Sequence, residues 1–439
     1  MDYDLIIIGA GWAGFNAALK GKELGLKVAL VEKDKIGGTC LNYGCIPTKS
    51  LIQSAKTYSL IQKSTAKGSL AHPAKLEFAL AQARKDKLVQ QLQHGMKFML
   101  RGIDFLQEEA LIQSPDIVKA GQRKLKTRFI LISSGSKTLE LPNLKVDGKK
   151  IISSNEALAL QELPSSILII GGGAIGCEFA SLFSMLGVRV AIVEKMPQLL
   201  PGVDKDIAQK IEGIFKKNGI KVMINSDALD PATGINDYDK SLLCVGRIAN
   251  TRGLGLGQLG IALEKERIAV DACLKTNIDN IYAAGDCASK TMLAHFAAYE
   301  GELAVTNMAS PVLKKADNKN IPSCVYCHPE IASVGMDTES AARQGLDVRV
   351  HRFDFMGSGM AHILEETEGF IKVVSDKKSG QVLGAAIIGP RATELIGIMT
   401  LAVSSCLKVS QIRDIVFAHP SLSESLSEAL KDSHEIQGF

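Results

Sequence analysis

The chain has 439 residues, of which 46% are hydrophobic and 22% charged, which is ordinary for a globular protein of roughly two to four domains. Its formal net charge of +4 is spread along the sequence without a dense Lys/Arg block, which argues against nucleic-acid binding. Its nine cysteines are scattered and odd in number, unlike those of a small secreted protein stapled by disulfides.

The N-terminal segment has no basic n-region and no long apolar h-region, so we expect no signal peptide. No apolar run approaches the roughly 20 residues that a membrane-spanning helix needs. We therefore expect a cytoplasmic protein that does not enter a membrane, with a removed organellar transit peptide as the open alternative.

The first elements predict a nucleotide-binding unit. Leu5–Ile8 predicts a buried strand, helical spacing runs from Gly14 to about Leu24, and Val28–Val31 predicts the next strand, which ends at Glu32. The turn before the helix has the pattern G-x-G-x-x-G, formed by Gly9, Gly11 and Gly14. In this context the glycines allow a tight turn and the approach of a pyrophosphate to the helix N-terminus, and Glu32 is placed to bind an adenosine ribose.

Two cysteines, Cys40 and Cys45, follow in a glycine-rich segment. A pair at this spacing can close a disulfide across a loop into the start of a helix, where the helix N-terminus lowers the pKa of a thiol. Lys49 lies one helical turn beyond Cys45 on the same face, where it could stabilise negative charge on a reduced flavin. The alternative is that both cysteines are buried and structural.

Between this unit and the next, the sequence predicts a long helix and a strand. Ala79–Leu100 has helical spacing, and Phe129–Ile132 predicts a strand that ends in the turn Ser133–Ser136. A loop at 141–143 places the first domain boundary near Lys150.

The nucleotide-binding pattern then returns. Ile167–Ile170 and Val190–Val193 predict strands on either side of a second glycine turn, and Glu194 follows the second strand. The glycines of this turn are Gly171, Gly172, Gly173 and Gly176. Glu194 favours NAD over NADP because a carboxylate repels a 2′-phosphate. Arg189 and Lys195 flank the strand, and a contact of Lys195 with a phosphate keeps NADP open.

The rest of the chain predicts a further strand and helix and then a mixed α+β tail. The strand Ile281–Ala284 is closed by Gly285 and Asp286, helical spacing covers Met292–Met308, and Lys314–Asn320 is a polar linker. The tail predicts strands at Val348–Phe355, Phe370–Val374 and Val382–Ile388, followed by helices at Thr393–Cys406, Val409–Val416 and Leu422–Leu430.

Four motifs together resemble those of the class I pyridine nucleotide–disulfide oxidoreductases: the redox segment 37–49, the segment 281–286, the turn 133–136 and the tail 418–424 with His419 and Glu424. Within that class, the segments 292–295 and 388–396 resemble those of the dihydrolipoamide dehydrogenases most closely. The resemblance covers nearly the whole chain. It implies an α/β fold with two Rossmann-like dinucleotide-binding domains, for FAD and NAD, and a C-terminal α+β dimerisation domain.

The resemblance also implies a division of the chain and a set of site residues. The expected parts are an FAD domain at 1–150, an NAD domain at 151–266, a second FAD or central part at 267–315 and an interface domain at 316–439. Cys40, Cys45, His419 and Glu424 are the implied catalytic residues, and no metal is expected. The implied cofactor-binding residues are Gly9, Gly11, Gly14, Glu32, Lys33, Gly38, Thr39, Lys49, Ala110, Ser134, Gly135, Gly171, Gly173, Ile175, Gly176, Glu178, Glu194, Gly246, Gly285, Asp286, Met292, Leu293, Ala294 and His295.

The resemblance implies FAD-dependent oxidation of protein-bound dihydrolipoamide with NAD as acceptor. Cys40 would exchange with the substrate, Cys45 would face the flavin, and His419 of the partner subunit would act as base, oriented by Glu424. The implied partners are a second copy of the chain and the lipoyl domain of a 2-oxo acid dehydrogenase or glycine cleavage complex. Two alternatives stay open: a reductase of another disulfide, and a non-catalytic subunit of a complex.

Departures from the family pattern motivate those alternatives. Between Asn225 and Asp239 a short turn-rich stretch replaces a small β-meander of the NAD domain. Ala174 stands where many relatives carry a larger side chain that gates the nicotinamide pocket, Phe417 replaces a histidine, and Glu108 replaces a glycine near the adenine. The pair Cys324 and Cys327 has C-x-x-C spacing, but it lies on an apolar strand and has no second pair for zinc, so we expect core packing there.

Overall fold

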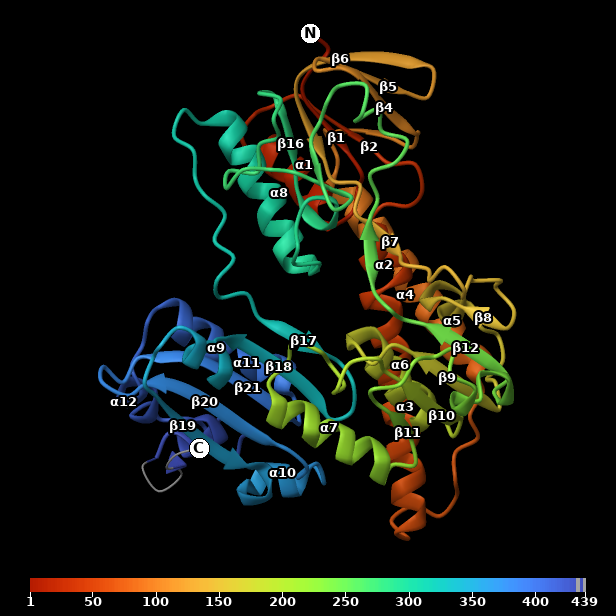
Figure 1. Ribbon diagram of the computed structural model, residues 1–439, viewed down its shortest axis with the longest axis vertical. Helices are drawn as coiled ribbons and strands as arrows, with labels where there is room; N and C mark the ends of the chain where they lie inside the picture. The colour runs from red at the N-terminus through yellow and green to blue at the C-terminus, as the bar shows by residue number, and fades with distance from the viewer. Residues whose placement is uncertain (432–434, 437–439) are drawn as a thin grey trace.

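The computed structural model describes residues 1–431 and 435–436 and contains three main β-sheets (Figure 1). The first sheet has the strand order β3-β2-β1-β6-β5-β4, and β16 pairs with β6. Its strands are β1 (Tyr3–Ile8), β2 (Val28–Val31), β3 (Asp104–Leu106), β4 (Ala110–Ser114), β5 (Ile117–Ala120), β6 (Arg123–Ile132) and β16 (Ile281–Ala283). Strands β3, β2, β1, β6 and β16 run parallel, and β4 and β5 extend the sheet as antiparallel strands.

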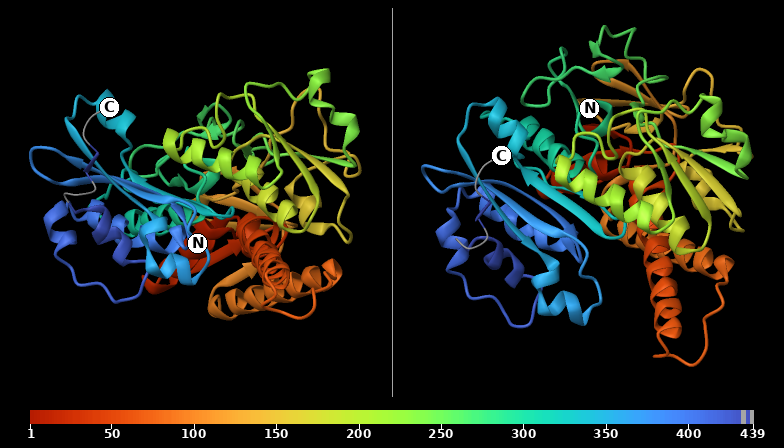
Figure 2. Two further views of the ribbon diagram at one scale, coloured as in Figure 1. Left: turned by 90° about the horizontal axis from the view of Figure 1, so that it is seen from below. Right: turned by 60° about the horizontal axis from the view of Figure 1, so that its bottom comes forward.

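Helices α1 (Trp12–Glu23) and α8 (Ala294–Ala309) lie together on one face of this sheet (Figure 1). Their close approach needs a glycine, because a Cβ on Gly301 would lie 2.2 Å from the carbonyl oxygen of Ala13. The chain runs from the first sheet into α2 (Gly38–Tyr43), α3 (Cys45–Ala66) and α4 (Phe78–Met99). The α3–α4 hairpin projects from the body of the molecule (Figure 2), and Leu51, Ile52 and Ala55 of α3 pack into the hydrophobic core.

The second sheet is parallel throughout, with the order β11-β10-β9-β12-β8. Its elements are β8 (Ile151–Ile152), α5 (Ser154–Ala159), β9 (Ser166–Ile170), α6 (Ala174–Met185), β10 (Arg189–Val193), α7 (Lys205–Lys217), β11 (Lys221–Met223) and β12 (Lys240–Leu243). Between β11 and β12 the chain forms only two short 3-10 helices, η1 (Pro231–Thr233) and η2 (Ile235–Asp237). The predicted loss of the β-meander is therefore confirmed.

Short elements join the two units. Strands β7 (Ser136–Thr138) and β13 (Arg247–Ala249) pair antiparallel, so the chain enters and leaves the second unit side by side. The remaining small elements are β14 (Leu263–Glu264), β15 (Arg267–Ile268) and η3 (Gly285–Cys287).

The C-terminal unit is an antiparallel sheet with the order β17-β18-β21-β20-β19-β22, covered by helices. Its strands are β17 (Ser323–Val325), β18 (Glu330–Gly335), β19 (Val348–Asp354), β20 (Phe370–Asp376), β21 (Val382–Gly389) and β22 (Glu435–Ile436). Its helices are α9 (Thr338–Arg343), η4 (Phe355–Gly357), α10 (Gly359–Ile363), α11 (Ala392–Ser404), α12 (Val409–Arg413) and α13 (Glu424–Ala429).

Where the sequence predicts a helix or strand, the structure differs mainly at its ends, whereas α7, β4, β5, β12 and β18 were not predicted. The helix predicted to reach Val416 ends at Arg413, and Val416 is 96% exposed, so no burial favours a further turn there. The helix predicted from Leu422 begins at Glu424. Within residues 1–431 no helix combines the length and apolarity needed to cross a bilayer.

Candidate active site

The first glycine motif forms a cradle at the start of α1. Gly9 has φ +101°, and a Cβ there would lie 2.4 Å from the carbonyl oxygen of Ser133, so only glycine fits. Gly11 is the N-cap of α1 and offers no side chain to the free N–H groups of the first turn. No atom lies within 4 Å of a Cβ built on Gly11, so this space is open to an anionic group.

The carboxylate of Glu32 is held at the edge of this cradle. It accepts hydrogen bonds from the backbone N–H groups of Ala10 at 2.7 Å and Asp34 at 2.8 Å, which leaves lone pairs for a ribose. The adjoining first cavity has a volume of about 200 Å³. The predicted residues that line it are Gly9, Gly11, Glu32, Lys33, Gly38, Thr39, Ala110, Ser134 and Gly135.

The two cysteines of the redox motif come together where α2 ends and α3 begins. Cys40 lies on α2, Cys45 is the first residue of α3, and their thiols are hydrogen-bonded to each other. The hydrogen bond with Cys40 and the Lys49 ammonium lower the pKa of Cys45 to about 7, although burial acts in the opposite direction. The same hydrogen bond raises the pKa of Cys40. Cys45 is therefore the thiol of the pair that carries the negative charge.

Both thiols line a second space, the thiol cavity, of about 260 Å³. It is continuous with the first cavity, because the two share Gly11, Thr39, Gly135 and further lining residues. The predicted residues that line the thiol cavity are Gly11, Thr39, Cys40, Cys45, Lys49, Gly135, Ile175, Glu178, Gly285, Asp286, Met292, Leu293 and Ala294.

An ion pair lies beside the thiols. The Lys49 ammonium is 2.7 Å from one carboxylate oxygen of Glu178 and 2.9 Å from the other. Glu178 comes from α6, so this contact joins the redox helix α3 to the second dinucleotide-binding unit. The Glu178 side chain is buried, and the pairing with Lys49 is what permits a carboxylate there.

The second glycine motif repeats the first. Gly173 is the N-cap of α6, and no atom lies within 4 Å of a Cβ built on it. Glu194 accepts hydrogen bonds from the backbone N–H groups of Gly172 and Met196, both at 2.7 Å. The adjoining second cavity has a volume of about 690 Å³. The predicted residues that line it are Gly171, Gly173, Ile175, Glu194, Gly246 and Met292.

The thiol cavity and the second cavity meet at a common wall. Ala174, Ile175 and Met292 line both of them. The side chain of Ala174 is a single methyl group, so the wall at this position is thin. The thiol cavity and the second cavity therefore converge on one wall, with a pair of thiols beside it.

Comparison with known proteins identifies this arrangement. Residues 3–301 match the family model described as pyridine nucleotide-disulphide oxidoreductase, and residues 321–430 match the dimerisation domain of the same family. The chain belongs to the pyridine nucleotide–disulphide oxidoreductase family.

Relatives of the same family match the chain over nearly its full length. A dihydrolipoyl dehydrogenase from Zymomonas mobilis and one from Bacillus subtilis are each 35% identical, covering 98% of this chain and 97% of theirs. Among solved structures, the HOCl-induced flavoprotein disulfide reductase RclA from Escherichia coli has a TM-score of 0.87 at 29% identity, covering 98% of this chain and 99% of that one. LpdA from Mycobacterium tuberculosis has a TM-score of 0.88 at 25% identity, covering 97% and 99%.

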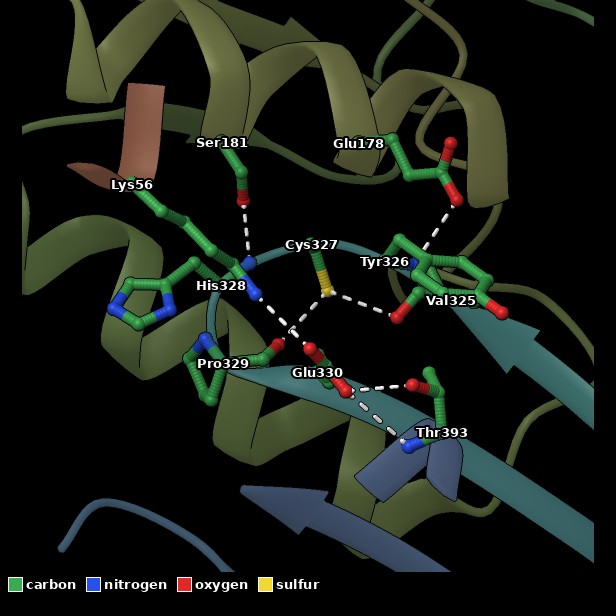
Figure 3. Close-up of polar contacts among 10 residues, drawn as sticks. All are labelled: Lys56, Glu178, Ser181, Val325, Tyr326, Cys327, His328, Pro329, Glu330 and Thr393. Carbon is green, nitrogen blue, oxygen red and sulfur yellow. Dashed lines mark hydrogen bonds and ion pairs between the residues drawn. The ribbon is translucent and has the colours of Figure 1, made fainter. Parts of the chain in front are cut away.

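In this family member, the C-terminal unit contacts the redox helix through the turn between β17 and β18 (Figure 3). The backbone N–H of Tyr326 donates to Glu178 at 3.0 Å, and the Lys49 ammonium lies 4.8 Å from the centre of the Tyr326 ring. The backbone N–H of His328 donates to the hydroxyl of Ser181, one turn further along α6. Tyr326 therefore touches both members of the buried ion pair.

A second ion pair fixes the other end of this turn (Figure 3). Glu330 accepts from the Lys56 ammonium at 3.0 Å and from the Thr393 hydroxyl at 2.7 Å. Lys56 stands two helical turns beyond Lys49 on α3. The pKa of Glu330 is lowered against the effect of burial, chiefly by Lys56 and Thr393, so this carboxyl stays ionised. Cys327 lies buried between these contacts and donates its thiol to the Pro329 carbonyl at 3.1 Å.

The predicted catalytic dyad lies apart from the cavities. His419 Nδ1 donates to Glu424 Oε1 at 2.8 Å, and Glu424 Oε2 accepts from the Ser421 N–H at 2.7 Å. Because a carboxylate only accepts, Nδ1 carries the proton and Nε2 of the neutral ring is an acceptor. The His419 side chain is 81% exposed, and neither dyad residue lines any of the three cavities of this subunit.

Three other predicted residues do not line the cavities. Gly14 and Gly176 are packing positions, since a Cβ there would lie 1.9 Å and 2.0 Å from the carbonyl oxygens of Gly9 and Gly171. His295 is exposed on α8 and bonds the Pro322 carbonyl at 2.9 Å.

Sequence reasoning missed a polar group in the lining of the thiol cavity. The Arg247 guanidinium donates through Nε to the Ser136 hydroxyl at 2.8 Å, and that hydroxyl donates to Asp286 at 2.5 Å. Both Arg247 and Ser136 line the cavity. Arg247 directly follows Gly246 after β12, and the only signal for it was its place at the carboxyl end of a parallel strand.

Proposed function

We propose that this protein is an FAD-dependent dihydrolipoyl dehydrogenase that passes electrons from protein-bound dihydrolipoamide to NAD. The observation that carries the proposal is the position of the Cys40–Cys45 pair. It lies in a cavity that shares Ala174, Ile175 and Met292 with the second dinucleotide cavity. The relatives named dihydrolipoyl dehydrogenase, at 35% identity, support the choice of substrate.

The residues around the first cavity and the thiol cavity fit FAD. The open space above Gly11 and the uncapped N–H groups of α1 suit a pyrophosphate, and Glu32 suits the adenosine ribose. Lys49 and Asp286 would hold the flavin and ribityl portions. The second cavity offers the same set to NAD through Gly173 and Glu194. When bound, FAD would supply a two-electron relay between the thiols and the nicotinamide.

The chain's own residues would perform the thiol exchange. A substrate thiol, deprotonated by His419 of the partner subunit, attacks the sulfur of Cys40 in the Cys40–Cys45 disulfide. A bond forms between the substrate and Cys40, the disulfide breaks, and Cys45 leaves as a thiolate. The second substrate thiol then displaces Cys40 and closes the lipoamide disulfide. Glu424 stabilises the imidazolium of His419, and Lys49 lowers the pKa of Cys45, which eases its departure.

The proposal includes the assembly and the domain division. We propose a homodimer, supported by the dimerisation-domain match and by the exposed His419–Glu424 dyad. The partner would be a lipoyl domain of a 2-oxo acid dehydrogenase or glycine cleavage complex. Of the domain limits 1–150, 151–266, 267–315 and 316–439, the start of the second part is supported by β8, which begins at Ile151 and pairs with β12. Its end at 266 is not supported, because β13 returns to β7 and Leu254, Leu256 and Ile261 pack against the first sheet. The scattered cysteines support a reducing compartment, and we propose the cytoplasm.

An anaerobic titration of the purified dimer tests this function. Reduction by dihydrolipoamide should produce a long-wavelength absorption band from the Cys45 thiolate against the flavin, and NADH should produce the same band. The Cys45→Ser variant should lose both the band and the NAD-linked oxidation of dihydrolipoamide.

A substrate panel separates the closest alternative. Lipoamide, glutathione disulfide and coenzyme A disulfide are compared as acceptors of electrons from NADH. Fastest turnover with lipoamide supports the proposal. Preference for another disulfide, or full activity of Cys45→Ser, would contradict it.

A further inference from the structure

The second cavity has an uneven distribution of charge at its adenosine end. Lys195 is the only basic side chain among its lining residues within the described part of the chain, and the same lining contains Glu194 and Asp227. The Lys195 ammonium lies 3.6 Å from Asp227 Oδ2. A lysine directly after the ribose-binding glutamate is the residue that would otherwise meet a 2′-phosphate. Here Asp227 already pairs with it.

The backbone holds Asp227 in this position. It stands at the start of the short segment 225–239, which is tied to the strand end because Asn225 N–H donates to the Met196 carbonyl and Ser226 N–H to the Glu194 carbonyl. The Leu229 N–H donates to Asp227 Oδ1 at 3.0 Å. This bond, together with Lys195, lowers the pKa of Asp227 and keeps it ionised. The trimmed segment therefore presents a fixed negative charge to the cavity.

Arg189, the basic residue at the start of β10, also interacts with segment 225–239. Arg189 lies at the opposite end of β10 from Glu194, so it is not at the cavity. Its Nη2 donates to the Asp237 carbonyl at 2.9 Å, and its guanidinium lies 4.8 Å from the centre of the Tyr238 ring. Arg189 is thus excluded as a partner for a 2′-phosphate.

The first dinucleotide site has the same construction. Its strand ends in Val31-Glu32-Lys33, and the second ends in Val193-Glu194-Lys195. Lys33 pairs with a carboxylate from elsewhere in the chain, Glu109, at 3.8 Å. In the proposed function the first site binds FAD, whose adenosine ribose has no 2′-phosphate. The second site therefore has the same glutamate followed by a paired lysine as a site whose ribose carries no 2′-phosphate.

We propose that Asp227 is a specificity-determining residue, which makes the second site select NAD over NADP by pairing with Lys195 and placing a second carboxylate at the ribose. The inference rests on the proposed function, because it assumes that this cavity binds the nicotinamide dinucleotide. Removal of the Asp227 charge frees the Lys195 ammonium to bind a 2′-phosphate. It also removes the repulsion between the Asp227 carboxylate and that phosphate.

Equilibrium binding tests this without turnover. Calorimetry on the flavin-loaded dimer compares 5′-AMP with adenosine 2′,5′-bisphosphate in the wild type and in Asp227→Asn. We expect Asp227→Asn to shift the ratio of the two affinities toward the bisphosphate by about two- to fivefold, the size expected for an exposed ion pair. The shift should shrink at high salt. The ratio of NADPH to NADH efficiency should move in the same direction.

Two further variants make the test specific. Asp279→Asn removes one charge from a distant surface ion pair, with Lys275 at 2.8 Å, and should leave the ratio unchanged. Asp227→Asn in a Lys195→Ala background should give a smaller gain than in the wild-type background, because only the reduced repulsion remains when the lysine is absent. An unchanged ratio in Asp227→Asn, or a gain of the same size with and without Lys195, overturns the inference.

Nucleotide binding and dihydrolipoamide oxidation, measured together, distinguish failure of this inference from failure of the proposed function. If the wild type binds 5′-AMP at this site and Asp227→Asn shifts the ratio, but dihydrolipoamide is not oxidised, only the substrate assignment fails. If neither nucleotide binds, both the inference and the proposed NAD site are overturned.

Discussion

The two dinucleotide-binding units have nearly the same ligand-facing geometry. The first glycine of each motif has a similar backbone, with φ +101° at Gly9 and +104° at Gly171. In both units a glutamate at the strand end accepts a backbone N–H from the glycine-rich turn at 2.7 Å. The N-cap glycine of each helix faces open space.

The units differ in the chain that flanks the cavity and covers the rest of the sheet. The first sheet continues into the antiparallel strands β4 and β5, whereas the second unit has only η1 and η2 in segment 225–239. Ala228 and Tyr238 of this segment pack with Leu144 against Leu168 and Leu243 of the sheet. The comparison teaches that local geometry fixes the glycine motif, while a few buried side chains of segment 225–239 suffice to cover one face of the second sheet.

The largest expected effect comes from matched substitutions in the two motifs. A Cβ at position 14 would lie 1.9 Å from the Gly9 carbonyl oxygen, and one at position 176 would lie 2.0 Å from that of Gly171. Both changes force the glycine turn open. We expect Gly14→Ala to yield a colourless protein without flavin, and Gly176→Ala a yellow protein that NADH no longer reduces. Absorption spectra and stopped-flow reduction measure the two outcomes.

Gly213→Ala is the control for these variants. Gly213 lies in α7 of the second unit, and nothing lies within 4 Å of a Cβ at that position. The change should preserve both functions and stabilise the helix by up to about 1 kcal/mol. A yellow, NADH-reducible Gly176→Ala protein would show that the tight turn is not required in the second unit.

The next largest effect concerns the packing of segment 225–239 against the second sheet. Tyr238 is 5% exposed and belongs to the core on that face of the second sheet. Tyr238→Ala should destabilise the second unit by about 3 kcal/mol, because it removes a buried ring and leaves a cavity. Tyr238→Phe keeps the ring and should cost far less.

Two probes separate the units in this experiment. The protein has one tryptophan, Trp12, at the start of α1, so its fluorescence reports the first unit during urea unfolding. Proteolysis within segment 225–239 reports the second. Cleavage that precedes the Trp12 transition in Tyr238→Ala is the expected result, and a single shared transition at unchanged stability would contradict the role of Tyr238.

The same comparison explains what the sequence could predict. Strand β2 was predicted with its bounds, and the glycine turns were predicted, because these features depend on neighbours within a few residues. The His419–Glu424 contact spans five residues and was also predicted. The absence of the meander was visible as a short spacing between Asn225 and Asp239.

Contacts between distant segments could not be predicted in this way. Tyr326 approaches Lys49 only because β17 folds back onto α6, and nothing in the residues around 326 indicates that approach. The bond between Arg247 and Ser136 depends on the pairing of β13 with β7 across the two units. Such contacts follow from the assembly of the sheets, which local periodicity does not specify.

A smaller effect distinguishes the cysteines of the two units. The pKa of Cys45 is lowered to about 7, whereas burial raises the pKa of Cys177 and Cys244 in the second unit. In the reduced protein, iodoacetamide should modify Cys45 at a rate that rises with pH and has a midpoint near 7. Cys177, which is buried, should stay unmodified until the protein unfolds. Peptide mapping after alkylation at a series of pH values measures this, and a midpoint near 9 would contradict the proposed thiolate.

The smallest expected effect is a pH dependence that originates in the first unit. Glu300 of α8 is buried, accepts the Gly285 N–H at 2.8 Å beside the Asp286 turn, and has its pKa raised to about 7 by burial. Between about pH 4.5 and 7 the unfolded chain loses this proton and the folded chain keeps it, so stability from this group falls as pH rises. Glu300→Gln keeps the acceptor and cannot ionise. It should therefore gain stability relative to wild type as pH rises from 5 to about 7.5, in urea unfolding followed by Trp12 fluorescence. Glu302→Gln, at an exposed position of the same helix, should show the same dependence of unfolding free energy on pH as the wild type. If Glu300→Gln also shows the wild-type dependence, the Glu300 carboxylate is solvated in the folded protein and the prediction is wrong.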